Sequence, residues 1–126
     1  PEARLPHPDL YQPTLILIDD DPAVLTSLSF VMEIEGFSVR GFSSAEDVLD
    51  SGLDLAPCCL VVDHTLPGMS GLELIELLRT RDPGQRAILT CSSLTPKIEE
   101  RAGLSGLRII EKPVLGSTLV DAIRAL

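Results

Sequence analysis

One short stretch decides how the rest of the sequence is interpreted: LILIDDDPAV, residues 15–24. Four apolar residues run directly into three consecutive carboxylates, Asp19, Asp20 and Asp21. Neighbouring like charges repel one another, and burial of any carboxylate costs free energy. One of them has a plain role, because Asp21 is a suitable N-cap for a helix that has Pro22 at its first position. The other two indicate a buried strand that ends in a functional acidic cluster.

The length and composition indicate one folded domain. The chain has 126 residues, 44% of them hydrophobic, which is enough for a single core and argues against disorder. A net charge of −9 argues against direct binding of nucleic acid. No apolar run approaches the roughly 20 residues of a membrane span, and the first residues lack the pattern of a signal peptide. We therefore expect a cytoplasmic domain without a membrane partner.

The N-terminal residues and the cysteines are not expected to carry chemistry. Residues 1–13, PEARLPHPDLYQP, contain four prolines and no periodicity, and predict an arm or linker before a domain at 14–126. We expect the chain to be part of a longer protein. Cys58, Cys59 and Cys91 are predicted to be buried, reduced thiols, and no cysteine or histidine pair has the spacing of a zinc site.

After the arm, short apolar runs alternate five times with amphipathic segments. Capping-box spacing, seen in Ser43 with Glu46 and in Ser70 with Glu73, predicts the starts of two helices. The predicted strands are 14–18, 37–42, 58–62, 87–90 and 107–110, and the predicted helices are 22–35, from 43, from 70, about 96–103 and 116–126. The last helix is predicted to bury one face, formed by Leu119, Ala122, Ile123 and Leu126. This alternation is typical of a parallel α/β sheet covered by helices on both faces.

Chemically active side chains follow the predicted strands. In a parallel sheet all strands end at the same edge, where ligands bind. The first strand ends at the acidic run, the third at Asp63 and the fourth at Thr90, and the fifth leads to Lys112. Clustered carboxylates suit Mg²⁺, which prefers oxygen ligands and relieves their mutual repulsion. Together with a hydroxyl and a lysine they indicate a site that handles phosphoryl groups, in which an aspartate can itself be the acceptor.

Four motifs in this order resemble the response-regulator receiver domain of two-component signalling: IDDDP, VVDHTLPGMSGLEL, ILTCSS and IIEKPV. The resemblance runs from about Thr14 to Leu126. It implies a flavodoxin-like sheet of five parallel strands in the order 2-1-3-4-5, with helices on both faces. It also implies a cis peptide bond between Lys112 and Pro113, as is common in the family.

The resemblance implies a phosphoacceptor and a metal site. Asp63 resembles the aspartate that accepts the phosphoryl group. Asp19 and Asp20 resemble the acidic pair that binds Mg²⁺ with it, Asp20 being the more direct ligand. The backbone carbonyl of Thr65 would be a further ligand.

The resemblance also implies a switch beside the acceptor. Thr90 resembles the switch hydroxyl, and Lys112 resembles the lysine that pairs with the phosphoryl oxygens. Cys91 and Ser92 begin the loop after the switch, where most members have alanine or glycine in place of the cysteine. Ile109 stands where many members have a tyrosine or phenylalanine. These departures concern the signalling surface more than the phosphorylation chemistry.

We therefore expect a phosphoacceptor signalling domain rather than an enzyme that acts on a separate substrate. Its phosphoryl donor would be a sensor histidine kinase or a phosphotransfer protein. An output domain is expected on the same chain, either a DNA-binding domain downstream or a kinase core before the arm. The face built on the fourth and fifth strands would change on phosphorylation and could form a homodimer.

Three alternatives are considered. A receiver-like module that binds proteins without phosphorylation is favoured by Ile109 and by the short fourth helix. A phosphatase with an aspartyl nucleophile usually needs a second acid two residues further on, where Thr65 stands. A flavin-binding domain would bring its phosphate loop against three carboxylates, which would repel it. His64, beside the acceptor, is interpreted as an exposed loop residue rather than a general base.

Overall fold

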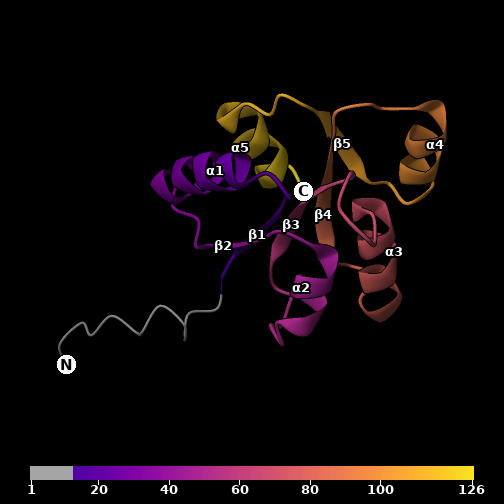
Figure 1. Cartoon of the computed structure of the whole chain (residues 1–126), viewed down its shortest axis with the longest axis horizontal. Coiled ribbons are helices and arrows are strands. Elements are labelled where there is room, and N and C mark those ends of the chain that lie inside the picture. Colours follow the sequence, from indigo (N-terminus) through magenta and orange to yellow (C-terminus); the bar gives the residue numbers. More distant parts are fainter. Residues whose placement is uncertain (1–12) are drawn as a thin grey trace.

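The strands of this fold are short and apolar, and helices enclose them on both sides (Figure 1). The computed structural model describes residues 13–126, so the arm predicted at 1–13 lies outside the described residues except for Pro13. The elements in chain order are β1 (Leu15–Ile18), α1 (Pro22–Ile34), β2 (Val39–Phe42), α2 (Ala45–Asp50), β3 (Cys59–Asp63), α3 (Gly71–Arg81), β4 (Arg86–Cys91), α4 (Pro96–Leu104), β5 (Arg108–Glu111) and α5 (Gly116–Arg124). The five strands are parallel and lie in the order β2-β1-β3-β4-β5, as expected.

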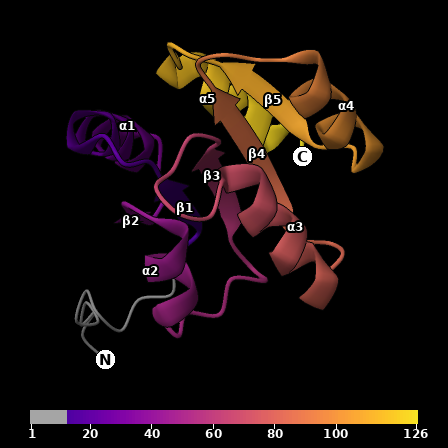
Figure 2. The ribbon, with the colours of Figure 1, turned by 45° about the vertical axis from the view of Figure 1, so that its right-hand side comes forward.

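Each strand of the central sheet supplies both faces of the core. Successive side chains of a strand point to opposite faces, so β1 sends Leu15 and Leu17 to one side and Ile16 and Ile18 to the other. The first pair packs in a cluster with residues of α1 and α5, and the second pair packs with residues of α2, α3 and α4. Figure 2 shows the same division of the helices. The near-continuous apolar runs of the sequence are explained by this two-sided burial.

Two of the three predicted helix caps are confirmed. Asp21 is the N-cap of α1, and its side chain accepts a hydrogen bond of 2.9 Å from the backbone N–H of Ala23. At α3, the Ser70 hydroxyl accepts from the N–H of Glu73, and the Glu73 carboxylate accepts from the N–H of Ser70. These caps satisfy backbone donors that the first helical turn leaves unpaired.

The capping box predicted for Ser43 and Glu46 is wrong by one residue. Ser44 is the N-cap of α2, and its hydroxyl accepts from the N–H of Asp47. Ser43 instead donates to the Asp47 carboxylate at 3.4 Å. Two adjacent serines offer the same capping chemistry, and the packing of α2 on the sheet selects the second. Glu46 is thereby released from the cap and contacts a distant loop, described below.

Element ends differ from the prediction where tertiary contacts decide them. Strand β2 begins at Val39 rather than at 37, because Val39 is the residue that faces Leu15 at the start of β1. Helix α5 ends at Arg124, and Leu126 is exposed instead of buried because it follows the last helical turn.

All three cysteines are buried thiols, as predicted, and burial raises the pKa of Cys59 to about 11. No helix in residues 13–126 is long and apolar enough to cross a membrane.

Candidate functional site

The register of the sheet brings the predicted site residues to one edge. Ile18 faces Val62 across β1 and β3, so the residues that follow them, Asp19 and Asp63, lie next to each other. Asp63 faces Thr90 across β3 and β4. Lys112 follows the last residue of β5 at the same edge. Side chains that are up to 93 residues apart in sequence therefore meet at the carboxyl ends of the strands, as the sequence predicts.

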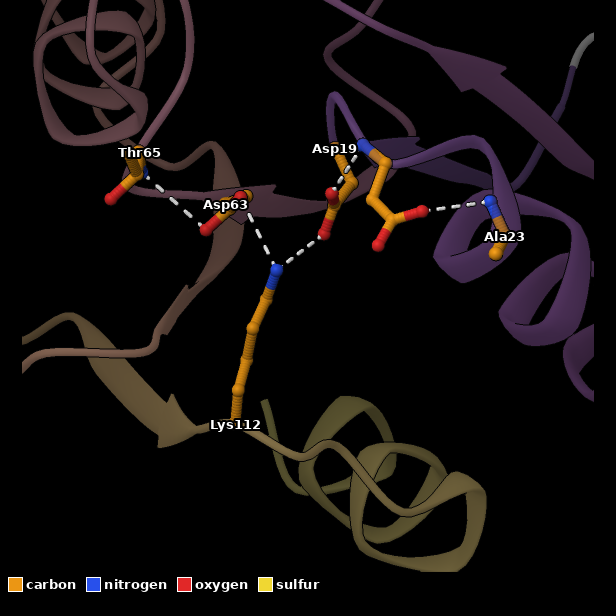
Figure 3. A network of polar contacts seen from close by, with 6 residues as sticks. Asp19, Ala23, Asp63, Thr65 and Lys112 are labelled. Carbon is orange, nitrogen blue, oxygen red and sulfur yellow. Dashed lines mark hydrogen bonds and ion pairs between the residues drawn. The ribbon is translucent and has the colours of Figure 1, made fainter.

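Three carboxylates form the acidic part of the site. One oxygen from each of Asp19, Asp20 and Asp63 lies within 4.8 Å of the other two. Asp19 and Asp63 are almost completely buried, whereas Asp20 is exposed. The Asp19 carboxylate accepts from the N–H of Asp21 at 2.9 Å, and Asp63 Oδ1 accepts from the N–H of Thr65 at 3.4 Å (Figure 3). Burial, followed by the neighbouring charge of Asp19, raises the pKa of Asp63.

Lys112 is the cation of the site (Figure 3). Its Nζ donates to Asp19 Oδ2 at 2.8 Å and lies 3.2 Å from Asp63 Oδ2. Burial alone would lower the pKa of Lys112, but the hydrogen bond and charge of Asp19 and then those of Asp63 outweigh it, so the pKa is raised. The lysine is therefore held charged between the two buried carboxylates. Its peptide bond to Pro113 is cis, as expected.

The donor set fits a hard divalent cation. Three oxygen ligands converge, one of them accessible to solvent, and a single ammonium compensates only part of their charge. Mg²⁺ typically uses one or two carboxylates and keeps several waters, which an open and oxygen-only site allows. Nitrogen or sulfur ligands, which softer metals prefer, are absent from this cluster of described residues.

Of the residues predicted for the switch, Thr90 lies beside the acceptor. Thr90 is buried near the end of β4, and its carbonyl accepts from the backbone N–H of His64. Cys91 is also buried, and its carbonyl accepts from the N–H of Lys112 at 2.9 Å, which joins the end of β4 to the residue after β5. Ser92 is exposed at the start of the following loop. Ile109 is half-buried on β5 and packs against the core that faces α2, α3 and α4.

His64 lies in a loop, as predicted, but the prediction that it is exposed is wrong. Its side chain is half-buried, and its Nδ1 atom is buried with no hydrogen-bond partner within the described residues. The residue stands between β3 and α3, and its carbonyl accepts from the N–H groups of Leu66 and Gly71. No local pattern indicates this burial, because it depends on how α3 returns over the end of β3.

Two further residues of the site were missed from the sequence. Glu46 of α2 accepts a hydrogen bond from Met69 in the loop after Asp63, across 23 residues. Gly71 begins α3 against the backbone of Asp63, where a Cβ atom would lie 2.2 Å from the Asp63 carbonyl oxygen. Glycine is a poor helix former, so its presence at the start of a helix was the one available signal. Glu46 had no comparable signal, since its partner is set by the tertiary fold.

An apolar groove opens beside the lysine. It has a volume of about 280 Å³ and lies between the first half of α1 and the residues after β5. Its lining residues are Ala23, Val24, Ser27, Leu28, Lys112, Pro113 and Val114. The groove therefore borders the site at Lys112.

Comparison with known proteins agrees with this geometry. Transcriptional regulatory protein FixJ of Azorhizobium caulinodans is 37% identical over 110 residues, which cover 86% of this chain and 52% of the relative. Transcriptional regulatory protein AfsQ1 of Streptomyces coelicolor is 35% identical over 115 residues, covering 90% and 50%. The chain thus spans about half the length of these curated relatives.

Solved structures show the same architecture. A CheY-like response regulator receiver domain protein from Methanospirillum hungatei has a TM-score of 0.80 and 26% identity, covering 88% of this chain and 90% of that one. The BeF3-activated DrrB receiver domain, at 22% identity, shares the fold with a TM-score of 0.79 and covers 91% and 97% of the two chains. The family model of the response regulator receiver domain matches residues 15–124. The chain belongs to the response-regulator receiver domains of two-component systems.

Proposed function

We propose that this receiver domain accepts a phosphoryl group on the carboxylate of Asp63 and thereby switches a signalling surface. The observation that carries the proposal is the environment of this side chain. Asp63 is buried at the strand edge, 3.2 Å from the Lys112 ammonium and next to the carboxylates of Asp19 and Asp20. A nucleophilic carboxylate placed between a cation and a metal-binding cluster suits phosphoryl transfer, which depends mainly on positioning and charge neutralisation.

Asp19, Asp20 and Asp63, with the backbone carbonyl of Thr65, are the residues proposed to hold Mg²⁺. The metal would supply positive charge to the phosphoryl oxygens while it relieves the repulsion among the carboxylates. Asp20 is the exposed member of the three and is proposed as the most direct ligand. Asp19 is held by the N–H of Asp21 and by Lys112, so its part is to fix the lysine as well as the metal.

The proposed donor is a phosphohistidine of a sensor histidine kinase or a phosphotransfer protein. A carboxylate oxygen of Asp63 forms a bond to phosphorus as the phosphorus–nitrogen bond of the donor breaks. The imidazole nitrogen leaves with the electron pair and takes a proton from water. Lys112 already lies against Asp63, and its N–H groups can turn from the two carboxylates to the new phosphoryl oxygens.

Phosphorylation is proposed to act through Thr90 and the loop after it. The Thr90 hydroxyl and Lys112 would gain contacts with the phosphoryl group, and only such differential contacts can shift an equilibrium between two states. Ile109 is β-branched and has no ring that could move between exposed and buried positions. We therefore expect the change to lie mainly in residues 90–96, with little movement of β5.

The partners follow from the surface and from the relatives. The apolar groove beside Lys112 is the proposed approach for the donor, because it borders the phosphoacceptor edge. The face built on β4 and β5 is proposed to form a homodimer, and Leu104 at the end of the neighbouring α4 is exposed. Several relatives are named transcriptional regulators and are about twice as long, which supports an output domain on the same chain. DNA binding is assigned to that domain, since this one has a net charge of −9.

In this proposal the domain acts in the cytoplasm, as a phosphoacceptor rather than as an enzyme with a separate substrate. The test is incubation with acetyl phosphate and Mg²⁺, followed by intact-mass measurement. Wild type should gain one phosphoryl group that hydroxylamine removes, whereas Asp63→Ala should gain none. Asp50→Ala, which removes an exposed carboxylate of α2, is the control and should be labelled normally. Equal labelling of Asp63→Ala would refute the assignment of the acceptor.

One alternative rests on a specific observation. Ile109 replaces an aromatic switch residue, which suits a receiver-like module that binds its partner without phosphorylation. In that case wild type would take no phosphoryl group from acetyl phosphate, and the partner would bind Asp63→Ala as tightly as it binds the wild type.

A further inference from the structure

Glu46 forms a contact that the phosphoacceptor chemistry does not by itself explain. It lies in the first turn of α2, and its Oε2 atom accepts a hydrogen bond of 3.1 Å from the backbone N–H of Met69. The carboxylate also lies against Gly68, where a Cβ atom would be 2.8 Å from Oε2. Gly68 has a φ of +73°, a conformation that glycine adopts without strain. The Glu46 side chain of α2 therefore contacts the backbone of a loop that begins 18 residues later in the sequence.

That loop is the one that follows the phosphoacceptor. We call residues 64–70 the acceptor loop; it joins Asp63, the last residue of β3, to α3. The loop is closed at its base by the His64 carbonyl, which accepts from the N–H groups of Leu66 and Gly71. Its last residue is held by the capping box of α3. Asp63 of β3 and Glu73 of α3, the two elements that the loop joins, also accept hydrogen bonds from it. Within residues 13–126, Glu46 is the one side chain from any other helix or strand that does so.

The position of the loop matters for the site. Thr65 donates its N–H to Asp63 Oδ1 at 3.4 Å, and its carbonyl is a proposed metal ligand. Thr65, Pro67 and Gly68 are exposed, so little burial holds this part of the loop in one conformation. If the loop adopts the binding conformation in only a fraction of the molecules, the apparent affinity for the ligand is reduced by that fraction. Contacts made by residues that do not bind the metal, but that orient its ligands, therefore affect metal affinity.

We propose that Glu46 is a positioning residue that holds the acceptor loop in the conformation required for Mg²⁺ binding beside Asp63. This inference rests on the proposed function. The hydrogen bond to Met69 is the working contact, and the negative charge of Glu46 is secondary. Glutamine at this position can accept the same hydrogen bond without the charge, whereas aspartate keeps the charge but is one methylene too short.

The test compares four variants in the metal-free protein and during an Mg²⁺ titration followed by NMR. Glu46→Ala and Glu46→Asp should each weaken Mg²⁺ binding by about threefold to tenfold, the effect of one lost hydrogen bond. Glu46→Gln should bind within about twofold of wild type by the same reasoning. Asp50→Ala removes a charge from the same helix and should bind like wild type. In the metal-free state the Met69 amide should exchange faster in the alanine and aspartate variants only.

The outcomes separate this inference from the proposed function. If wild type binds Mg²⁺ and Glu46→Ala binds it equally well, the positioning role is refuted. Weakening of Glu46→Gln to the level of Glu46→Ala would also overturn it, because charge would then be the cause. Glu46→Asp keeps the acidic first turn of α2, so it answers the question even if the alanine variant fails to fold. If wild type itself binds no Mg²⁺, the proposed function fails instead.

Discussion

Replacement of Gly71 by alanine tests how closely α3 must approach the phosphoacceptor strand. Gly71 is the first residue of α3. A Cβ atom there would lie 2.2 Å from the carbonyl oxygen of Asp63, 2.8 Å from its carbonyl carbon and 2.9 Å from Cγ1 of Val62. The strand that carries both residues is buried and paired on both sides, so it has no free direction in which to move. The added methyl group must therefore displace α3, Asp63 or both.

The magnitude follows from two opposing effects. Overpacking by one methyl group costs about 1–3 kcal/mol, and contact with backbone atoms below 3 Å favours the upper end. Alanine gains up to about 1 kcal/mol over glycine inside a helix, and less in its first turn. We expect a net loss of about 2 kcal/mol of unfolding free energy, or a Tm lower by roughly 5–10 °C for a domain of this size. Phosphorylation by acetyl phosphate should also slow, because the backbone of Asp63 shifts.

The assay is urea denaturation followed by circular dichroism, since the chain has no tryptophan. Gly103→Ala is the matched control: Gly103 lies in α4, and a Cβ atom there has no heavy atom within 4 Å. The control should be as stable as wild type or up to about 1 kcal/mol more stable. If Gly71→Ala matches the control in stability and in rate of labelling, the close approach of α3 to Asp63 is not present in solution.

Three further results are expected. Asp63→Asn should stabilise the metal-free protein at neutral pH, because the folded pKa of Asp63 is raised above 3.8 and its ionisation therefore opposes folding; urea titrations should show the gain disappear below pH 3.8. Lys112→Met should lower the unfolding free energy by about 1.5–3 kcal/mol near neutral pH. Because the pKa of Lys112 is raised in the folded state, the charged lysine stabilises the fold at every pH below its titration, which includes pH 7. An unchanged urea midpoint of Lys112→Met at pH 7 would contradict this expectation. Mg²⁺ should raise the Tm of wild type, and scanning calorimetry should show a smaller rise for Asp20→Ala.

Local patterns were sufficient to predict the strands and most of the site. Apolar runs of four and five residues, such as 15–18 and 58–62, are buried, and such runs are typical of strands covered on both faces. Because parallel strands end at one edge, the residues at and just after the strand ends, Asp63 and Lys112 among them, were predicted to meet without any knowledge of distances. The location of the candidate site thus follows from the order of residues along the chain.

The prediction was wrong for residues whose local sequence allows two roles or two degrees of burial, and the folded structure decides between them. Ser43 and Ser44 are equally good caps, and the choice of Ser44 freed Glu46 to contact the acceptor loop. His64 follows a buried strand and precedes a loop, so its partial burial depends on the return path of α3. Leu126 continues the apolar periodicity of α5 but lies beyond its last turn.

The charge at the strand edge explains why so costly an arrangement suits a switch. Three carboxylates face one ammonium, which leaves the cluster with two uncompensated negative charges when all are ionised. Asp19 and Asp63 are buried, so water cannot screen this repulsion well. Burial first, and then the charge of Asp19, raises the pKa of Asp63. A module that only bound proteins would be more stable without the excess charge. One divalent cation would neutralise this excess charge. The proposed phosphoryl group on Asp63 would then return negative charge near Lys112, so both events would change the charge of this edge.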